Sequence, residues 1–287
     1  MPTPPVERAD LPIAVFDSGV GGLTVLEALR KRLPNEDLLY LGDTARVPYG
    51  TRSPDTVVRY ASRVAGHLWG RGIKALVVAC NTATTWALGE LESEGKRRGI
   101  PVLGVIEPGV EKALAVTRTG RIGVIGTEGT IRGGRYEKLL RAKRPDVEVL
   151  SVPCPLFVAL AEEGWTEGPV LDLVAERYLA PLRGKVDTLI LGCTHYPLLR
   201  GGIARALPDV VLVDSATSMA EAVARALPPL GLSARRPSGT MTLLATDNRE
   251  RFLALGERFL EEPVEDVEIV DLDAGDEWLE HLRAAAP

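Results

Sequence analysis

The sequence has few cysteines and no long hydrophobic run. Its three cysteines, at positions 80, 154 and 193, form an odd and widely spaced set, unlike the dense disulfide framework of a small secreted protein. Its longest apolar runs, such as residues 75–80, are far shorter than the roughly 20 residues that a membrane helix needs. The polar, Pro-rich residues 1–10 lack the apolar stretch of a secretory signal, and we expect them to form a loose leader. These absences favour a cytoplasmic protein that does not span a membrane.

An excess of positive charge is also absent. The chain of 287 residues has 34 Lys and Arg against 39 Asp and Glu, a formal charge of −5, which argues against binding to nucleic acid or to an anionic membrane. Hydrophobic residues make up 45% and charged residues 25%, as in folded soluble proteins. The length is sufficient for two domains that each bury a core.

Short aliphatic segments alternate with longer segments of helical period. We expect strands at residues 13–16, 37–41, 75–79, 102–105, 122–125, 147–150, 188–191, 210–213 and 242–245. They consist mainly of Val, Ile and Leu with little alternation, which is typical of strands buried on both faces of a parallel sheet. Helix signals are clearest where Ser53 can cap a helix that begins at Pro54 and is closed by Gly70 and Gly72. Helical patterns also run through residues 24–33, 82–97, 170–182 and 249–260. The sequence therefore predicts an α/β fold.

The chain carries a faint internal repeat. The segment IAVFDSG from residue 13 resembles IGVIGT from residue 122, and VVACNT around Cys80 resembles LILGCTH around Cys193, at nearly the same offset. Two related α/β halves explain both similarities. We expect one domain from residues 1–106 plus 220–287, carrying Cys80, and a second from residues 107–219, carrying Cys193. The two parallel-sheet domains are expected to be related by pseudo-two-fold symmetry, with the active site between them.

In each half, a predicted buried strand ends at a cysteine that small polar residues follow. Asn81 and Thr82 follow Cys80, and Thr194 and His195 follow Cys193. Sites in open α/β sheets lie at such carboxyl ends of strands, where the positive end of the next helix lowers the pKa of a thiol. A single cysteine here is more readily explained as a small buried hydrophobe. Their equivalent positions in a repeat favour a paired catalytic role.

Two cofactor hypotheses are weaker. Cys80, Cys154, Cys193 and His195 are nominal zinc ligands, but only the last two are close in sequence, whereas structural zinc sites use closely spaced pairs. The segment FDSGVGGLT at residues 16–24 invites comparison with dinucleotide-binding loops, yet Thr24 stands where the G-x-G-x-x-G pattern requires glycine. The side chains of residues 17 and 18 either meet a small charged ligand or cap the following helix in a tight turn.

Other polar segments allow either a functional or a purely structural interpretation. Residues 42–50, GDTARVPYG, form a loop that either presents a ring and backbone donors or is only a turn. His195 is placed to relay a proton beside Cys193, whereas His67 and His281 are expected to be structural or solvated. Glu162 and Glu163 on their own are ordinary helix-end carboxylates.

Five segments in order resemble the glutamate racemase family, within the wider aspartate/glutamate racemase superfamily. They are FDSGVGGLTVL (16–26), GDTARVPYG (42–50), ACNTAT (79–84), CPLFVALAEEG (154–164) and LGCTHYPLL (191–199). The resemblance covers residues 13 to about 215, and it implies a cofactor-independent enzyme that interconverts L-glutamate and D-glutamate. It further implies a homodimer that supplies D-glutamate for bacterial cell-wall peptidoglycan.

The resemblance also implies roles for individual residues. Cys80 and Cys193 match the two proton-transfer residues, Asp17 matches the aspartate that assists one of them, and His195 matches the histidine that assists the other. Glu162, with Glu163 as the adjacent alternative, matches the acidic residue before the family's glycine. Substrate contacts are expected from both halves, at Asp17, Ser18, Tyr49, Gly50, Asn81, Thr82, Thr194 and His195.

Racemisation needs a base on one face of the α-carbon and an acid on the other, a requirement that two thiols on facing walls meet. Without the electron sink of pyridoxal phosphate, fixed hydrogen-bond donors around the substrate carboxylate must stabilise the carbanion. Two other functions stay open. An aspartate racemase or related amino-acid racemase or decarboxylase would use the same fold, and a two-lobed small-ligand-binding protein would place its contacts at facing strand ends without a thiol in each lobe.

Overall fold

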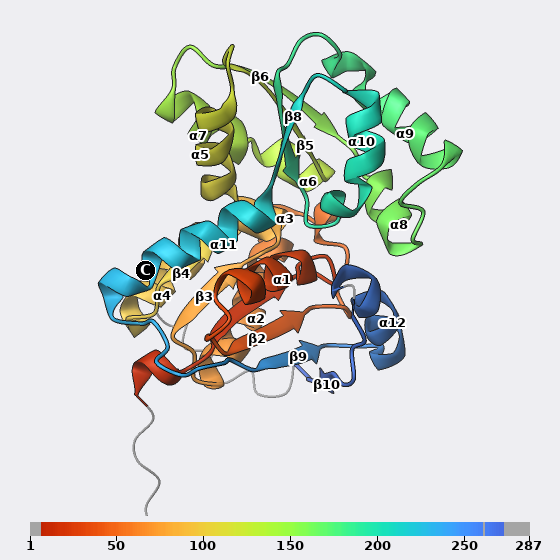
Figure 1. Ribbon diagram of the computed structural model, residues 1–287. Coiled ribbons are helices and arrows are strands. Elements are labelled where there is room, and N and C mark those ends of the chain that lie inside the picture. Colours follow the sequence, from red (N-terminus) through yellow and green to blue (C-terminus); the bar gives the residue numbers. More distant parts are fainter. Residues whose placement is uncertain (1–6, 261, 273–287) are drawn as a thin grey trace, which may run out of the picture.

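The computed structural model describes residues 7–260 and 262–272, which form two lobes with a parallel sheet in each (Figure 1). The sheet of the first lobe has the strand order β10-β9-β2-β1-β3-β4, and the sheet of the second lobe has the order β6-β5-β7-β8. All strand pairs in both sheets are parallel. The predicted α/β fold with parallel sheets is confirmed.

The first lobe is built from the beginning and the end of the described chain. Its strands are β1 (Ile13–Asp17), β2 (Leu38–Gly42), β3 (Ala75–Val78), β4 (Val102–Gly104), β9 (Met241–Ala245) and β10 (Glu268–Ile269). The helices around it are α1 (Leu23–Arg32), α2 (Pro54–Gly70), α3 (Asn81–Trp86), α4 (Leu88–Arg98), α11 (Ser215–Ala226) and α12 (Arg249–Leu260). Short 3₁₀ turns add η1 (Arg8–Asp10), η2 (Tyr49–Thr51) and η5 (Pro228–Leu230).

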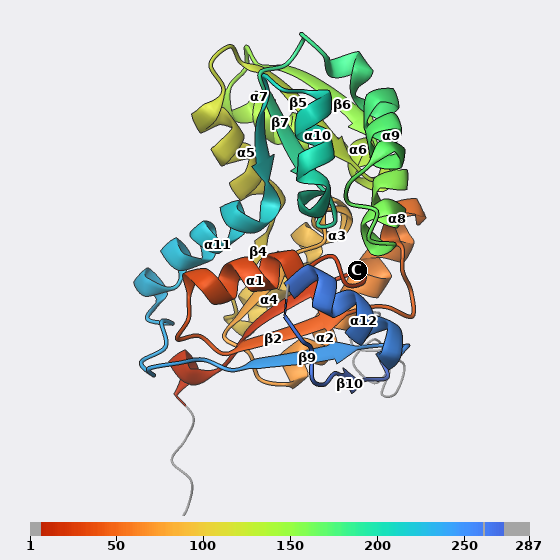
Figure 2. The same ribbon diagram turned by 45° about the vertical axis from the view of Figure 1, so that its right-hand side comes forward.

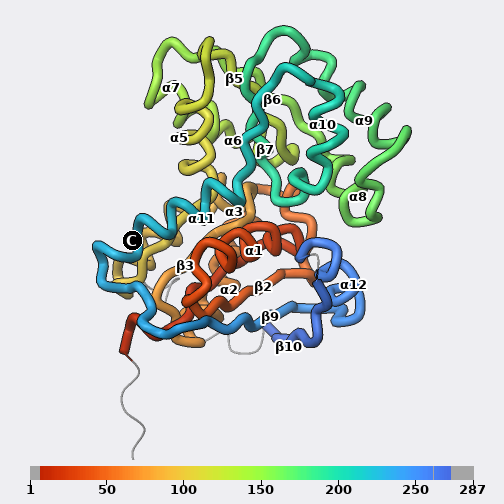
Figure 3. Tube along the Cα trace, in the orientation of Figure 1, coloured from red at the N-terminus to blue at the C-terminus, as the bar shows by residue number. Residues whose placement is uncertain are grey.

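The second lobe is one continuous stretch of chain. Its strands are β5 (Arg121–Gly126), β6 (Glu148–Pro153), β7 (Thr188–Gly192) and β8 (Val211–Asp214). Its helices are α5 (Ile106–Val116), α6 (Glu128–Gly133), α7 (Arg135–Lys143), α8 (Leu156–Glu162), α9 (Pro169–Leu179) and α10 (Arg200–Ala206), with 3₁₀ turns η3 (Ala180–Leu182) and η4 (Tyr196–Leu199). The tube in Figure 3 shows the chain entering this lobe through α5 and leaving it towards α11, which packs beside α1.

Apolar side chains on both faces of each sheet explain why the strands lack polar alternation. Ile13 and Val15 of β1 pack in a cluster with α1, α11 and α12, whereas Ala14 and Phe16 pack in a second cluster with α2 and α4. In the second lobe, side chains of β7 also pack on both faces of the sheet. On one face they contact α5 and α7, and on the other face they contact α8, α9 and α10. Every residue of β1 and β7 is buried. Because helices cover both faces of each sheet, consecutive residues of a central strand are all buried, and most of them are aliphatic.

The predicted strands are all present, with ends shifted by up to three residues, and β10 was not among them. The helix over residues 54–70 is also confirmed, because Ser53 Oγ accepts the N–H of Thr56 and Pro54 is the first helical residue. The single helix predicted for residues 82–97 is wrong, since it is divided at Ala87 into α3 and α4. The Thr85 hydroxyl donates to the Asn81 carbonyl at 2.8 Å, a local bond of the kind that bends helices.

The repeat seen in the sequence corresponds to a repeat in strand order. The order β2-β1-β3-β4 in the first sheet recurs as β6-β5-β7-β8 in the second. The similar segments at residues 13 and 122 are therefore β1 and β5, and those around Cys80 and Cys193 include β3 and β7. Both cysteines thus follow the same strand of their respective sheets.

The predicted loose leader is partly wrong. Residues 1–6 and His281 lie outside the described residues, but Arg8–Asp10 form η1, and Ala9 is buried. The carbonyl of Ala9 accepts a hydrogen bond from the fully buried Lys74 ammonium at 2.5 Å, and Lys74 also pairs with Glu36. A buried ammonium group needs such acceptors, which fixes this part of the N-terminus. Among the described helices, none has the length and apolar character of a membrane span.

Candidate active site

The carboxyl ends of β1, β3 and β7 meet at a narrow cavity between the lobes. It is lined by Asp17, Ser18, Val47, Pro48, Tyr49, Gly50, Cys80, Asn81, Thr82, Thr127, Val158, Gly192, Cys193, Thr194 and His195. All residues predicted to contact substrate lie here, together with both predicted proton-transfer cysteines. Of the predicted catalytic residues, only Glu162 does not line the cavity, and it lies behind His195.

Cys80 lies at the N-terminus of α3 in the first lobe. Its Sγ accepts the N–H of Ala83 at 3.4 Å and contacts the Ser18 hydroxyl at 3.7 Å. Burial, with the charge of Asp17 as a further cause, raises the pKa of Cys80 to about 12. The prediction that a helix N-terminus would lower this pKa is wrong for Cys80, because the loss of hydration outweighs the helix dipole. At neutral pH, Cys80 is therefore a thiol.

Cys193 begins a chain of three polar groups in the second lobe. Its Sγ lies 3.7 Å from His195 Nδ1, and His195 Nε2 lies 3.2 Å from Glu162 Oε1. Burial alone would lower the pKa of His195, but hydrogen bonds with Cys193 and Glu162 and the surrounding negative charges raise it to about 10. The hydrogen bond from His195 in turn lowers the pKa of Glu162. Glu162, and not the exposed Glu163, is thus the acidic partner of His195.

Asp17 ends β1 and lies between the two lobes. Its Oδ2 accepts the N–H of Gly19 at 3.1 Å, and its Oδ1 accepts the Thr194 hydroxyl at 3.4 Å. Burial raises the pKa of Asp17, although the nearby charge of His195 and the hydrogen bonds oppose this effect. The alternative in which residues 17 and 18 cap the next helix is wrong, since α1 has no side-chain cap. The Asp17 carboxyl group is instead available to the cavity.

Residues of the first lobe hold the segment that carries Cys193 and His195. The Thr24 hydroxyl donates to the Thr194 carbonyl at 3.1 Å, and Gly21 packs directly against Thr194 and the His195 ring. From α12, Phe259 contacts the His195 ring edge-on at 5.4 Å, and Arg251 donates to Glu162 Oε2 at 3.1 Å. Figure 2 shows α12 beside α8, where these contacts form. The positions of His195 and Glu162 in the second lobe therefore depend on contacts with the first.

The loop over residues 42–50 is fixed against the cavity by a buried carboxylate. Asp43 accepts the Tyr49 hydroxyl at 2.5 Å and the Thr246 hydroxyl at 3.0 Å, and it pairs with Arg46 at 3.2 Å. These bonds connect the loop to the segment that follows β9. Tyr49 is fully buried and Gly50 lines the cavity. The loop is therefore more than a turn, because its C-terminal part forms a wall of the site.

Several residues of the site were not predicted from the sequence. Thr127 lines the cavity, and its hydroxyl lies 2.9 Å from that of Thr82 across the lobes. The repeat contained a signal for Thr127, because aligning residue 13 with residue 122 matches it to Ser18. Arg251 and Phe259 carried no comparable signal. Cys154 does not line the cavity, and in the described residues no group of three or more His, Cys, Asp or Glu side chains is arranged for a metal ion.

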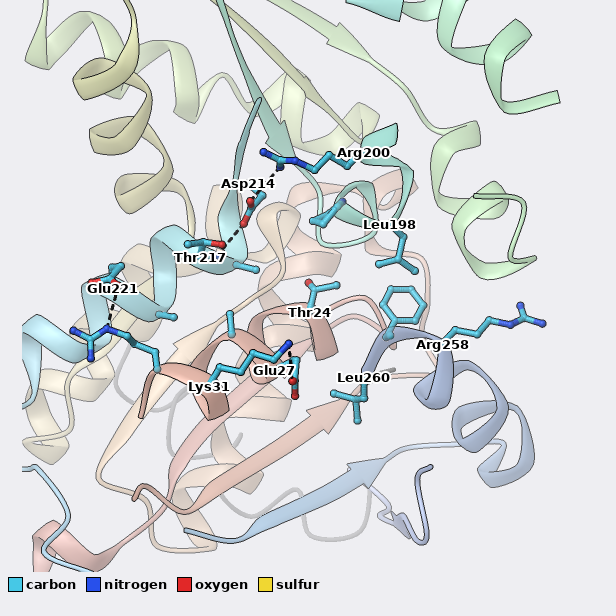
Figure 4. Close-up of a pocket in the computed structure, with 16 residues that line it drawn as sticks. Thr24, Glu27, Lys31, Leu198, Arg200, Asp214, Thr217, Glu221, Arg258 and Leu260 are labelled. Atoms are coloured by element: carbon cyan, nitrogen blue, oxygen red, sulfur yellow. Dashed lines mark hydrogen bonds and ion pairs between the residues drawn. The ribbon is translucent and has the colours of Figure 1, made fainter. Parts of the chain in front are cut away.

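A wider groove lies between the lobes beside α1, α11 and the end of α12 (Figure 4). Its charged side chains pair with one another, as Lys31 with Glu27, Arg32 with Glu221, and Arg200 with Asp214. No cysteine or histidine is among the described residues that line it. The wider groove therefore offers no pair of thiols, and its carboxylates are held in ion pairs, so the narrow cavity is the better candidate for chemistry.

The raised pKa of His195 predicts a pH-dependent contribution to stability. Between its ordinary value of 6.5 and the value of about 10 in the folded protein, the folded state binds more protons than the unfolded state. Stability from this group is therefore complete below about pH 6.5 and is lost as the pH rises through 10, by at most about 1.4 kcal/mol per pH unit. Urea unfolding of the wild type and His195→Asn at pH 6, 8 and 10 should give a difference that shrinks with pH. A constant difference would contradict the assignment.

Comparison with known proteins places these features in a family. The family described as Asp/Glu/Hydantoin racemase matches residues 23–223. Glutamate racemase of Geobacter metallireducens is 52% identical over 267 residues, which cover 91% of this chain and 97% of that protein. Glutamate racemase of Aquifex aeolicus is 49% identical over 253 residues, which cover 88% of this chain and 95% of that protein.

Solved structures give the same result. Glutamate racemase of Francisella tularensis in complex with D-glutamate superposes with a TM-score of 0.87 at 39% identity, covering 93% of this chain and 99% of that one. The Thermus thermophilus glutamate racemase in complex with β-chloro-D-alanine gives a TM-score of 0.85 at 46% identity, with the same coverage of 93% and 99%. An aspartate racemase of Picrophilus torridus gives 0.55 at 17% identity, a likeness of fold alone.

Proposed function

The chain belongs to the glutamate racemases of the Asp/Glu/Hydantoin racemase family, and we propose that it inverts the α-carbon of glutamate with the two cavity cysteines. It is an isomerase whose reaction interconverts L-glutamate and D-glutamate. One observation carries the two-base mechanism: Cys80 and Cys193 come from equivalent strand ends of the two lobes and line the same cavity. Such a pair can reach one carbon from opposite sides.

In one direction, the thiolate of one cysteine removes the α-proton while the thiol of the other delivers a proton to the opposite face. After one turnover, the cysteine that removed the α-proton is a thiol and the opposite cysteine is a thiolate. The reverse reaction exchanges these roles. Asp17 assists Cys80, whose pKa its charge helps to raise, and the chain of His195 and Glu162 assists Cys193. No cofactor takes part in this proposal.

The carbanion formed between the two transfers needs stabilisation by fixed donors. The Ser18, Asn81, Thr82 and Thr194 side chains line the cavity and are already held by the protein. Positioned acid–base catalysis contributes roughly 10²- to 10⁴-fold, so preorganised donors in a site closed to water must supply most of the remaining acceleration. We assign to these four residues, with Tyr49, Gly50, Asp17 and His195, the binding of the substrate.

Two alternatives are less well supported. An aspartate racemase would use the same fold, but that of Picrophilus torridus is 17% identical, against 39% to 52% for the four glutamate racemases named above. A two-lobed binding protein would not require a thiol in each lobe, nor a histidine and carboxylate behind one of them. Both features favour catalysis at an α-carbon over simple binding, and the similarity to glutamate racemases favours glutamate as the substrate.

Incubation of the purified protein with L-glutamate in deuterated water, without added cofactor, tests the proposal. We expect the optical rotation to decay to zero while deuterium enters the α-position, and we expect L-aspartate to react far more slowly. Faster reaction of L-aspartate would replace the proposed substrate. Binding of glutamate without any exchange would favour the binding protein.

The wider role follows from the product. We propose that the enzyme supplies D-glutamate for peptidoglycan in the bacterial cytoplasm and acts as a homodimer. Residues 1–106 plus 220–287 would form one domain and residues 107–219 the other, a division supported by the membership of the strands in two sheets. Exposed apolar side chains on and between α8 and α9, namely Leu156, Trp165, Val170 and Leu173, support an interface with a second subunit. Sedimentation at several protein concentrations measures the subunit number.

A further inference from the structure

Asn81 presents a buried hydrogen-bond donor without a partner. The side chain is 3% exposed and lines the cavity next to Cys80. Its Oδ1 accepts a hydrogen bond of 2.7 Å, whereas its Nδ2 has no partner within the part of the chain that the structure describes. Leaving such a group unsatisfied destabilises the folded protein, and native proteins rarely retain one without a purpose. This N–H group is therefore available to donate to an anionic ligand in the cavity that Asn81 lines.

The hydrogen bond to Asn81 Oδ1 comes from Tyr136, a residue of the opposite lobe. Tyr136 lies in the first turn of α7, and its side chain is 3% exposed. Its ring packs closely over Gly192, where an added Cβ atom would lie 3.0 Å from the ring. The position of its hydroxyl group is therefore set by the core of the second lobe. Burial also raises the pKa of Tyr136, so that the group stays a phenol with a proton to donate.

An asparagine amide has one acceptor and one donor end, and rotation by half a turn exchanges them. A phenol proton directed at Oδ1 favours the orientation in which the NH₂ group is left for the cavity. In the opposite orientation, the amide oxygen would face the carboxylates of the substrate and repel them. The hydroxyl of Tyr136 thus selects the orientation that binds an anion.

We propose that Tyr136 is a positioning residue, whose hydroxyl holds the Asn81 amide with its NH₂ group towards a carboxylate of the bound amino acid. This inference rests on the proposed function. Because Tyr136 and Asn81 belong to different lobes, the donor is correctly oriented only when the lobes are arranged as they are here. Substrate binding and the arrangement of the lobes are thereby coupled through one hydrogen bond.

The variant Tyr136→Phe removes the hydroxyl and keeps the ring over Gly192. We expect KM for both enantiomers of glutamate to rise about 10-fold or more, because hydrogen bonds to charged groups contribute about 1.5–3 kcal/mol, and we expect kcat to fall less. Steady-state polarimetry in both directions measures these constants. A merely structural role would lower the unfolding temperature and leave KM unchanged.

A double-mutant cycle with Asn81→Ala tests whether the Tyr136 hydroxyl affects KM through the Asn81 side chain. If Tyr136 acts through Asn81, Tyr136→Phe should add nothing to KM in the Asn81→Ala background. The matched control is Tyr178→Phe, which also removes a tyrosine hydroxyl from the second lobe. The Tyr178 hydroxyl accepts the Leu156 N–H, and Tyr178 does not line the cavity. The KM of this variant should match that of the wild type. Additive effects, or an unchanged KM in Tyr136→Phe, would overturn the inference. A wild type that does not racemise glutamate would instead refute the proposed function.

Discussion

Replacement of either cavity cysteine by serine is expected to slow the interconversion of L-glutamate and D-glutamate about 10³-fold or more. A hydroxyl group is far less acidic than a thiol, so serine can neither remove the weakly acidic α-proton at neutral pH nor return it efficiently. Cys80→Ser and Cys193→Ser should therefore both lose racemisation. Neither loss should be accompanied by a large change in folding stability, since the substitution preserves size.

The two variants should differ in what they retain. Each keeps one cysteine on one face of the substrate, so proton exchange without inversion should persist more for one enantiomer than for the other. Nuclear magnetic resonance of deuterium uptake into separate samples of L-glutamate and D-glutamate measures this difference. We expect opposite preferences in Cys80→Ser and Cys193→Ser, because the two thiols face the carbon from opposite sides.

Cys154 provides the matched control. It is buried in the second lobe, does not line the cavity, and its Sγ contacts the Val152 carbonyl at 3.6 Å. Cys154→Ala should retain activity within a few-fold of the wild type. Full racemase activity in either cavity variant, or a loss in Cys154→Ala as large as theirs, would show that proton transfer does not use the proposed pair.

A single methyl group at Gly21 is expected to reduce kcat/KM about 100-fold. A Cβ atom at this position would lie 2.4 Å from Thr194 Oγ1 and 2.5 Å from the His195 ring, so the segment after β7 must move. Displacement of a catalytic group by about 1 Å can cost 10²-fold in rate. Because His195 contacts both Cys193 and Glu162, a shift of its ring disturbs the whole chain of groups on that side.

Kinetics of Gly21→Ala by polarimetry, together with its thermal unfolding, measure this effect. The control is Gly89→Ala in α4, where no described atom lies within 4 Å of the added Cβ and the helix should tolerate or favour alanine. Gly89→Ala should leave kcat/KM unchanged. Wild-type kinetics in Gly21→Ala would mean that the close packing of the two lobes at this point does not position His195.

Most strands and several of the longer helices could be predicted because local patterns encode them. Runs of Val, Ile and Leu mark the strands, and Ser53 followed by Pro54 marks the start of α2. The short helices α6, α8 and α10 escaped prediction, since six or seven residues contain too few turns to show a helical period. The longer helices α5, α7 and α11 were not predicted either. The helix predicted for residues 82–97 is divided at Ala87, close to the hydrogen bond from the Thr85 side chain to the Asn81 carbonyl. The spacing of apolar residues contains no information about such a bond.

The cavity residues supplied by strand ends could also be predicted. Asp17, Cys80 and Cys193 each lie at or just after the end of a buried strand, and parallel strands bring such ends to one edge of a sheet. The electrostatic state of Cys80 could not be predicted in the same way. Its raised pKa depends on how completely the folded lobes remove water from the thiol, which no neighbouring residue in the sequence specifies.

The sequence by itself determined most of the strands and several of the helices, the repeat of the two halves and the placement of one cysteine at the same strand end in each. Only the tertiary structure decided which side chains complete the site from the other lobe. Tyr136 meets Asn81 from 55 residues away, and Arg251 meets Glu162 from 89 residues away. Helices and strands follow from interactions between near neighbours along the chain. Contacts between the lobes depend on how the surfaces of two folded lobes pack together, and no local sequence pattern specifies that geometry.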